Sequence, residues 1–205
     1  MNKFYRGIKK FFGGIIKLLY RIKVVNPQNE VYDKNFIVCA NHTSLMDVCA
    51  LVIAFKGQIR FMAKKEVFSV PILRSFVKAM GAFPVDRKNG DVAAIKKTLE
   101  ILKDGDCLGI FPQGTRRPYE NPRNTEVKDG VGMIASRSGV GVMPVYIKTK
   151  KGKLRMFRKT RVIIGEYIPP EALSVETTGR EKYKAVTEKI FDKVCALGES
   201  TEVKW

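Results

Sequence analysis

Short apolar runs alternate with segments whose apolar residues repeat at helical spacing along most of this chain. Strands are expected at residues 36–40, 59–63, 82–85, 107–111, 142–148 and 160–164. Helices are expected over about 45–55, 71–80, 92–103, 128–138 and 181–197, with a turn at Asn89-Gly90 and an N-cap at Asp91. Such alternation favours an α/β fold, a layered domain with a mixed, largely parallel sheet flanked by helices.

Residues 3–23 have a different pattern, which a helical projection at ~100° per residue makes clear. One half of the wheel carries Phe4, Tyr5, Ile8, Phe11, Phe12, Ile15, Ile16, Leu18, Leu19 and Ile22. The other half carries Lys3, Arg6, Lys9, Lys10, Lys17, Arg21 and Lys23, and no acid precedes Glu30. This pattern is typical of a helix bound to an anionic membrane surface, although an ordinary helix that covers the core is the alternative.

Gly13 and Gly14 lie in the middle of this segment and predict a bend or a two-helix arrangement. We therefore divide the chain into an amphipathic basic segment, residues 1–30, and a domain over residues 31–205. No uninterrupted apolar run reaches the ~18 residues that a spanning helix needs, and no cleavage site for a signal peptide is evident. The chain is expected to bind the cytoplasmic face of a membrane peripherally.

The composition narrows the possible partners. A formal net charge of +18 attracts anionic lipid, phosphorylated substrates, acidic carrier proteins or nucleic acid. Nucleic acid is not expected, because no recognition-helix motif or pattern of stacking aromatics is present. The four cysteines form no C-x-x-C pair and the chain has one histidine, which indicates reduced thiols and argues against a structural metal.

His42 follows the strand expected at 36–40, and strand ends are where α/β sheets commonly bind ligands. Asp47 lies five residues later, where the chain can fold back and bring the carboxylate to the imidazole. A carboxylate on one ring nitrogen leaves the other free to accept a proton, which suits general-base catalysis. Alternatively, His42 is a hydrogen-bonded structural residue, and Asp47 only completes a capping box that begins at Ser44.

No nucleophile motif such as G-x-S-x-G is present, and Cys39 falls within a buried strand. The nucleophile is therefore expected to be a substrate hydroxyl, with no covalent enzyme intermediate.

Asn41-His42-Thr43-Ser44-Leu45-Met46-Asp47 resembles the N-H-x-x-x-x-D block of the glycerolipid acyltransferases. Three further blocks follow in the family's order, at 81–87, 111–116 and 142–145, and the resemblance spans residues 36–168. The chain resembles the bacterial lysophosphatidate (1-acyl-glycerol-3-phosphate) acyltransferases. This resemblance implies transfer of an acyl group from an acyl carrier protein or coenzyme A thioester to the sn-2 hydroxyl of 1-acyl-glycerol 3-phosphate, giving phosphatidic acid.

The resemblance also implies roles for individual residues. His42 and Asp47 would be the catalytic pair, and no metal or redox cofactor is implied. The phosphate of the acceptor would be bound by Lys64, Arg87, Gly114, Thr115 and Arg116, with Lys128 a weaker candidate. Asn41, Gln113 and Pro144 would line the conserved blocks of the family, although Pro144 also fits a buried strand. The cations could alternatively belong to a basic surface.

Gln113 departs from the family pattern, which has glutamate at this position. Either glutamine imitates the hydrogen bonds of the glutamate, which we favour, or the change alters the acceptor. Two other functions therefore remain open. One is acylation of another lysophospholipid or of glycerol 3-phosphate, and the other is lipid binding at the membrane surface without catalysis.

Overall fold

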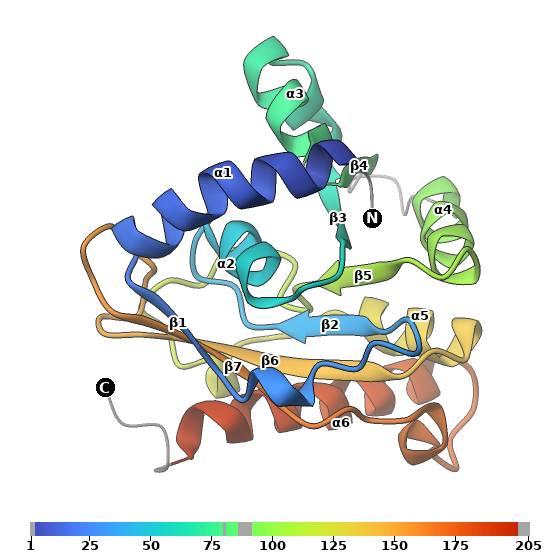
Figure 1. Cartoon of the computed structure of the whole chain (residues 1–205). Helices are drawn as coiled ribbons and strands as arrows, with labels where there is room; N and C mark the ends of the chain where they lie inside the picture. Colours follow the sequence, from blue (N-terminus) through green and yellow to red (C-terminus); the bar gives the residue numbers. More distant parts are fainter. Residues whose placement is uncertain (1–2, 80, 86–91, 201–205) are drawn as a thin grey trace.

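The computed structural model describes residues 3–79, 81–85 and 92–200, and within them seven strands form one sheet (Figure 1). The strands are β1 Ile22–Val25, β2 Ile37–Ala40, β3 Ile59–Lys64, β4 Ala82–Val85, β5 Cys107–Ile110, β6 Val142–Thr149 and β7 Thr160–Ile164. Their order is β1-β7-β6-β2-β5-β3-β4, and all neighbours are parallel except β6 and β7. The predicted mixed, largely parallel sheet is confirmed. The turn predicted at Asn89-Gly90 and the N-cap at Asp91 lie outside the described residues.

Helices cover both faces of the sheet (Figure 1). They are α1 Lys3–Leu19, α2 Asp47–Ala54, α3 Pro71–Ala79, α4 Val92–Lys103, α5 Gly130–Ser138 and α6 Gly179–Glu199. The sequence of strand β2 is continuously apolar because both faces of the strand are buried. Val38 and Ala40 pack in the core cluster with α2, whereas Ile37 and Cys39 pack in the cluster with α5 and α6. A parallel strand covered on both faces has no polar side to show.

The first helix ends earlier than the sequence predicted. Arg21 has a positive φ of 44°, and the buried Ile22 begins strand β1, which pairs in parallel with β7. Ile22 and Lys23 were therefore wrongly assigned to the helix. The mistake arose because Ile22 lies four residues after Leu18 and continues the helical spacing of apolar residues.

The two-helix arrangement expected at Gly13 and Gly14 was also wrong, since α1 is one continuous helix. A bend at these glycines stays a prediction. Gly13 faces α2, where a Cβ would lie 3.8 Å from Cγ1 of Ile53, an ordinary van der Waals contact. Lys9 also faces α2, because its amine donates to the carbonyl oxygens of Phe55 and Lys56. It does not belong to an exposed cationic half of the helix.

The apolar side of α1 is divided between core and solvent. Tyr5 is buried at 1% exposure, whereas the larger part of the apolar side is exposed, with Phe11 at 69%, Phe12 at 47%, Ile15 at 48% and Leu18 at 77%. Helix α1 therefore covers the core with one stripe and presents a second apolar stripe to the surroundings. None of the described helices combines the length and the hydropathy needed to cross a bilayer.

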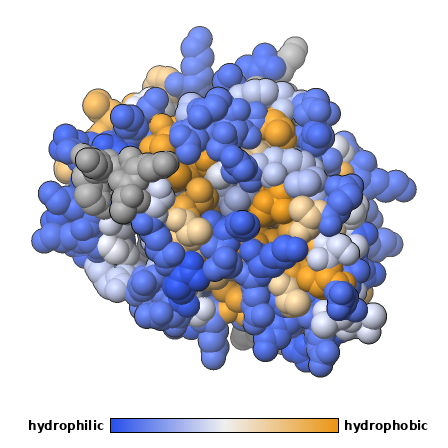
Figure 2. Space-filling model, turned by 90° about the horizontal axis from the view of Figure 1, so that it is seen from below, coloured by the Kyte–Doolittle hydropathy of each residue, from blue (hydrophilic) through white to orange (hydrophobic). Residues whose placement is uncertain are grey.

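The opposite face of the molecule, on the side of α6, is mainly hydrophilic with scattered apolar patches (Figure 2). Helix α6 exposes charges of both signs, among them Lys184, Glu188, Asp192 and Lys193. Solvated surfaces typically mix charges in this way. The exposed cations of α1, which include Arg6, Lys10 and Lys17, have no acidic counterpart on their helix.

Candidate active site

The candidate site lies at the edge of the sheet where β2, β5 and β3 end. Because these strands are parallel, with Cys39 paired to Ile110 and Phe61 to Gly109, their carboxyl ends meet at one edge. His42 follows β2, the segment from Phe111 follows β5, and Lys64 ends β3. The topology thus brings together three of the segments that the sequence analysis selected.

The predicted contact between His42 and Asp47 is confirmed. Nδ1 of His42 lies 3.0 Å from Oδ2 of Asp47, whose side chain is fully buried. An ionised carboxylate can only accept, so Nδ1 carries the hydrogen and Nε2 presents its lone pair. The described residues offer Nε2 no hydrogen-bond partner, and the side chain of His42 is 16% exposed. The imidazole is therefore oriented as a proton acceptor for a molecule outside the core.

Asp47 also organises the backbone before α2. Its Oδ2 accepts the amide hydrogens of Thr43 at 2.5 Å and Ser44 at 2.7 Å, and Oδ1 lies 3.3 Å from the hydroxyl of Thr43. The bond from Ser44 is the one that a capping box provides. The reciprocal bond of a capping box is absent, because the hydroxyl of Ser44 accepts the amide hydrogen of Met46 and α2 begins at Asp47. The carboxylate of Asp47 thus holds both the imidazole and the turn before α2.

Phe111 fixes the plane of the imidazole. Its ring stacks on His42 with centroids 4.1 Å apart and an interplanar angle of 16°, and Phe61 lies behind it at 6.3 Å. The stack restricts rotation of the imidazole about the bond to Cβ and covers one face of the ring. Sequence reasoning quoted Phe111 but gave it no role. Its place at the end of a predicted strand gives no sign of this contact, because the sequence does not reveal that this strand pairs with β2.

Gln113 supports the backbone of His42. Its Oε1 accepts the amide hydrogen of His42 at 2.7 Å, and its Nε2 donates to the hydroxyl of Thr125 at 2.7 Å, which in turn donates to the carbonyl of Pro122. Gln113 is 3% exposed, so it faces the interior of the loop. Thr125, which the sequence analysis missed, completes this chain of hydrogen bonds. The backbone of His42 makes a second hydrogen bond, since its carbonyl oxygen accepts the amide hydrogen of Arg117 at 2.8 Å.

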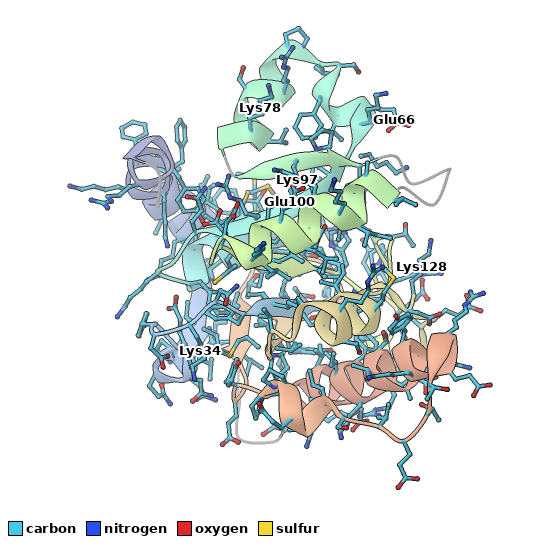
Figure 3. All side chains as sticks on the ribbon, turned by 90° about the vertical axis from the view of Figure 1, so that its right-hand side faces the viewer. Lys34, Glu66, Lys78, Lys97, Glu100 and Lys128 are labelled. Atoms are coloured by element: carbon cyan, nitrogen blue, oxygen red, sulfur yellow. The ribbon has the colours of Figure 1, made fainter. Side chains whose placement is uncertain are left out.

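The third block turns sharply after Phe111. Gly114 has a φ of +67°, and a Cβ there would lie 3.1 Å from Cδ and Cε of Lys128, so the turn requires glycine and lies against the lysine side chain. Thr115, Arg116 and Lys128 are exposed, and Figure 3 places Lys128 beside the start of α5. The structure therefore brings Lys128 to the third block, and the part of the chain that it describes gives Arg116 no ion pair.

The remaining predicted residues differ in their surroundings. Asn41 is buried and pairs with the backbone of β6, donating to the carbonyl of Ile147 at 3.2 Å and accepting its amide at 2.7 Å. It thus ties the ends of β2 and β6 together. Pro144 lies buried within β6, in register with Cys39, which fits the buried-strand alternative. Lys64 is exposed, and Arg87 lies outside the described residues.

The cysteines are free thiols. Burial raises the pKa of Cys39 well above its usual range, and burial, with Asp47 as a second cause, raises the pKa of Cys49 to about 11. Both thiols are therefore protonated near neutral pH, which makes them poor nucleophiles. Within residues 3–79, 81–85 and 92–200, no three His, Cys, Asp or Glu side chains are grouped as metal ligands.

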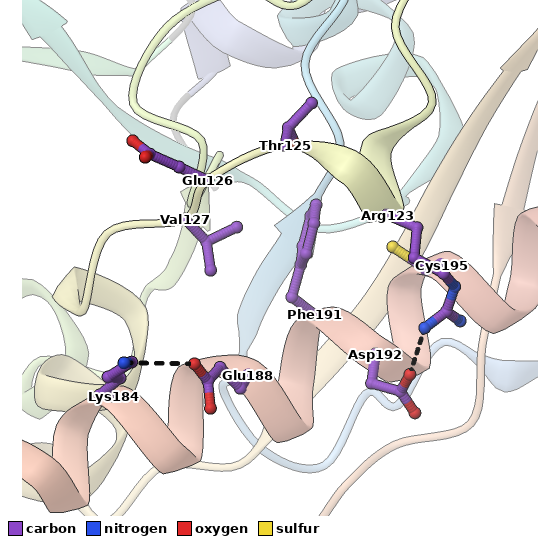
Figure 4. A pocket seen from close by; sticks show the side chains of 9 residues that line it. All are labelled: Arg123, Thr125, Glu126, Val127, Lys184, Glu188, Phe191, Asp192 and Cys195. Carbon is purple, nitrogen blue, oxygen red and sulfur yellow. Dashed lines mark hydrogen bonds and ion pairs between the residues drawn. The ribbon is translucent and has the colours of Figure 1, made fainter.

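A groove of about 490 Å³ lies between the segment 123–127 and α6 (Figure 4). Val127 and Phe191 point into it, and the ion pairs Arg123–Asp192 and Lys184–Glu188 flank it. His42 does not line this groove. Thr125 lines this groove, and its hydroxyl accepts a hydrogen bond from Gln113 of the candidate site.

Comparison with known proteins agrees with this arrangement, since a family model described as "Acyltransferase" matches residues 21–148. The chain belongs to the acyltransferase family. The 1-acyl-sn-glycerol-3-phosphate acyltransferase of Bacillus subtilis (strain 168) is 32% identical over 186 residues, which cover 89% of this chain and 91% of that protein. The enzyme of the same name from Streptococcus pneumoniae is 31% identical over 172 residues, 83% of this chain and 63% of its own length.

The fold comparison points to the same family. The crystal structure of the 1-acyl-sn-glycerophosphate (LPA) acyltransferase PlsC from Thermotoga maritima is 30% identical to this chain, with a TM-score of 0.72. The match covers 98% of this chain and 80% of that one. The resemblance drawn from the four blocks is confirmed, and the chain is an acyltransferase. The roles of single residues in this acyltransferase stay predictions.

Proposed function

We propose that this acyltransferase esterifies the sn-2 hydroxyl of 1-acyl-glycerol 3-phosphate and releases phosphatidic acid. The names of the B. subtilis and S. pneumoniae relatives support this acceptor. The observation that carries the proposal is the His42–Asp47 pair, whose Nε2 is left available to a substrate beside the third block.

In the proposed mechanism, the acceptor hydroxyl donates a hydrogen bond to Nε2 of His42. As the hydroxyl oxygen attacks the carbonyl carbon of the acyl thioester, His42 takes the proton and becomes an imidazolium, which the carboxylate of Asp47 stabilises. The tetrahedral intermediate then collapses, the carbon–sulfur bond breaks, and the thiolate leaves. The imidazolium returns the proton to the thiolate, so that no acyl group is ever attached to the enzyme.

Positioning of the acceptor rests on its phosphate. Thr115 and Arg116 are exposed on the turn after Phe111, Lys64 is exposed at the end of β3, and Lys128 is exposed just before α5. A guanidinium can bind two phosphate oxygens at once, whereas the lysines add positive charge. Arg87 belongs to the same proposed set by its place in the second block. Holding the phosphate here places the hydroxyl near His42, and such positioning lowers the activation barrier substantially.

We further propose that α1 holds the enzyme on the cytoplasmic face of an anionic membrane. The exposed stripe Phe11, Phe12, Ile15 and Leu18 would enter the headgroup region, while Arg6, Lys10 and Lys17 would contact lipid phosphates. The free thiols fit a reducing compartment. The acyl donor is a thioester of acyl carrier protein or coenzyme A, since an excess of cations suits the acidic carrier and the phosphates of the coenzyme alike.

Product analysis tests the proposed reaction. Purified enzyme is mixed with acyl carrier protein and coenzyme A thioesters of several chain lengths, together with lysophosphatidate, other lysophospholipids and glycerol 3-phosphate. Mass spectrometry should find phosphatidic acid as the main product. A different acylated acceptor would correct the substrate, and no product with any acceptor would indicate a lipid-binding protein without catalysis. Intact-mass measurement after incubation with donor alone should show no added acyl group.

A further inference from the structure

The connection between β6 and β7, residues 150–159, has an unusual charge and shape; we call it the β6–β7 hairpin tip. Its ten residues include the cations Lys150, Lys151, Lys153, Arg155, Arg158 and Lys159. No acidic residue occurs anywhere between Asp129 and Glu166. A solvated turn normally mixes both signs of charge, so this concentration favours an anionic partner.

Two apolar side chains of the hairpin tip face outward. Met156 is 46% exposed and Phe157 is 69% exposed, whereas Leu154 is buried at 3% in the core cluster and anchors the hairpin. Phe157 has a φ of +60°, a left-handed conformation that is unfavourable for a bulky residue. The backbone of Phe157 therefore adopts an unfavourable conformation although its ring stays mostly exposed to solvent.

Backbone hydrogen bonds join the hairpin tip to the end of α1. The amide of Phe157 donates to the carbonyl of Leu19 at 2.6 Å, and the amide of Thr160 donates to the carbonyl of Arg21 at 3.3 Å. Figure 1 shows this connection beside the last turn of α1. Leu18, in that same turn, is 77% exposed. Because these hydrogen bonds join them, the hairpin tip and the end of α1 would contact the same surface together.

The hairpin tip is also joined to the candidate active site. The amide of Tyr119 donates to the carbonyl of Gly152 at 2.8 Å, and the guanidinium of Arg155 donates to the hydroxyl of Tyr119 at 2.6 Å. Tyr119 follows the third block by three residues. The hairpin tip thus stands between the membrane-facing helix and the loop that carries Thr115 and Arg116.

We propose that the β6–β7 hairpin tip is a second membrane-binding element, which inserts Met156 and Phe157 among anionic lipids while its cations contact their phosphates. This inference rests on the proposed membrane binding of α1 and adds to it a contact next to the acceptor site. An anionic lipid surface is favoured over an acidic carrier protein, because the outward ring is tied to the exposed apolar turn of α1. Aromatic side chains and cations together are what interfacial segments use.

Vesicle binding by the full chain tests the proposal. The variant Met156→Gln, Phe157→Asn removes the apolar groups, and asparagine tolerates the left-handed conformation, so the backbone is kept. We expect its affinity for vesicles of equal parts phosphatidylglycerol and phosphatidylethanolamine to fall about tenfold or more. Val92→Ser, which alters a residue of α4 that is 76% exposed, is the matched control and should bind normally. Normal binding by the hairpin variant would overturn the proposal.

A parallel variant separates this inference from the role of α1. Phe11→Ser, Leu18→Ser should also weaken vesicle binding. If it does and the hairpin variant does not, only the hairpin inference fails; if neither changes binding, the proposed membrane role of α1 fails as well. A raised KM of the hairpin variant for acyl carrier protein thioesters, with vesicle binding unchanged, would mean that the tip docks the carrier.

Direct contact can be measured with Phe157→Trp in a Trp205→Phe background. Phosphatidylglycerol vesicles that contain brominated acyl chains should quench its fluorescence, and an equivalent Tyr32→Trp reporter, at a site 61% exposed on another segment, should not be quenched. Equal quenching of both reporters, or of neither, would contradict insertion of the hairpin tip.

Discussion

Replacing Asp47 separates its charge from its hydrogen bonds. Three N–H donors converge on Oδ2, from the imidazole of His42 and from the amides of Thr43 and Ser44. In Asp47→Asn the amide oxygen must take the place of Oδ2, because an NH₂ group there would face three donors. The NH₂ group then faces the hydroxyl of Thr43, which can accept. The fold and the tautomer of His42 are therefore kept, and only the negative charge is lost.

The expected magnitudes follow from these contacts. Loss of the charge should cost about 2–3 kcal/mol of transition-state stabilisation, or roughly 30- to 200-fold in kcat. A change that reversed the tautomer would cost about 10⁴-fold instead. Asp47→Ala leaves the amides of Thr43 and Ser44 without an acceptor, at about 1–3 kcal/mol each, so the free energy of unfolding should fall by roughly 2–6 kcal/mol.

The assay is steady-state transfer to lysophosphatidate, measured together with urea unfolding of each variant. Asp47→Asn should lose activity while its unfolding midpoint stays near that of the parent, and Asp47→Ala should lose both. A loss near 10⁴-fold in Asp47→Asn would show that the backbone amides do not fix the orientation of the side chain. A change smaller than about threefold would show that the charge is not used in catalysis.

Three further changes test other contacts. Gln113→Glu keeps an acceptor for the amide of His42 but loses the donor to Thr125, so kcat should change by less than about tenfold. A change of a hundredfold or more in steady-state assays would show that the charge at this position matters. Glu30→Ala removes a buried carboxylate that accepts hydrogen bonds from the backbone amides of residues 56 and 57. The free energy of unfolding should fall by about 1–3 kcal/mol while the specific activity stays unchanged. An unchanged midpoint of urea unfolding would contradict this. Burial raises the pKa of Cys49 to about 11 and that of Tyr5 to about 12, so the unfolded chain releases these protons first. The stability that these two groups contribute should be level from neutral pH to about pH 8 and fall between about pH 8 and 12 in urea titrations.

The positions of β2 to β7 along the chain could be predicted, and β2, β5, β6 and β7 were the clearest because most of their residues are buried. Their apolar runs are short and bounded by turns, and the helices between them have clear spacing. Strand β1 was missed for a physical reason. It lies at the edge of the sheet, has four residues, and is fully buried only at Ile22, whose spacing from Leu18 also fits the helix before it.

The contact between His42 and Asp47 could be predicted because the two residues are close in sequence. The supporting contacts could not, since they join distant segments. Phe111 reaches His42 from another strand, and Thr125 reaches it only through Gln113. Asn41 was placed correctly at the strand end, but its pairing with the backbone of Ile147 depends on the β2–β6 register, which no local pattern reveals.

Turnover by His42→Ala tests the central claim most directly. The imidazole hydrogen-bonds Asp47 and stacks on Phe111, so the variant should lose about 1–3 kcal/mol of unfolding free energy but stay folded and keep the parent's vesicle affinity. Removal of the base should lower kcat for transfer to lysophosphatidate by about 10²- to 10⁴-fold. A folded His42→Ala protein that turns over within a few fold of the parent would contradict general-base catalysis by this histidine.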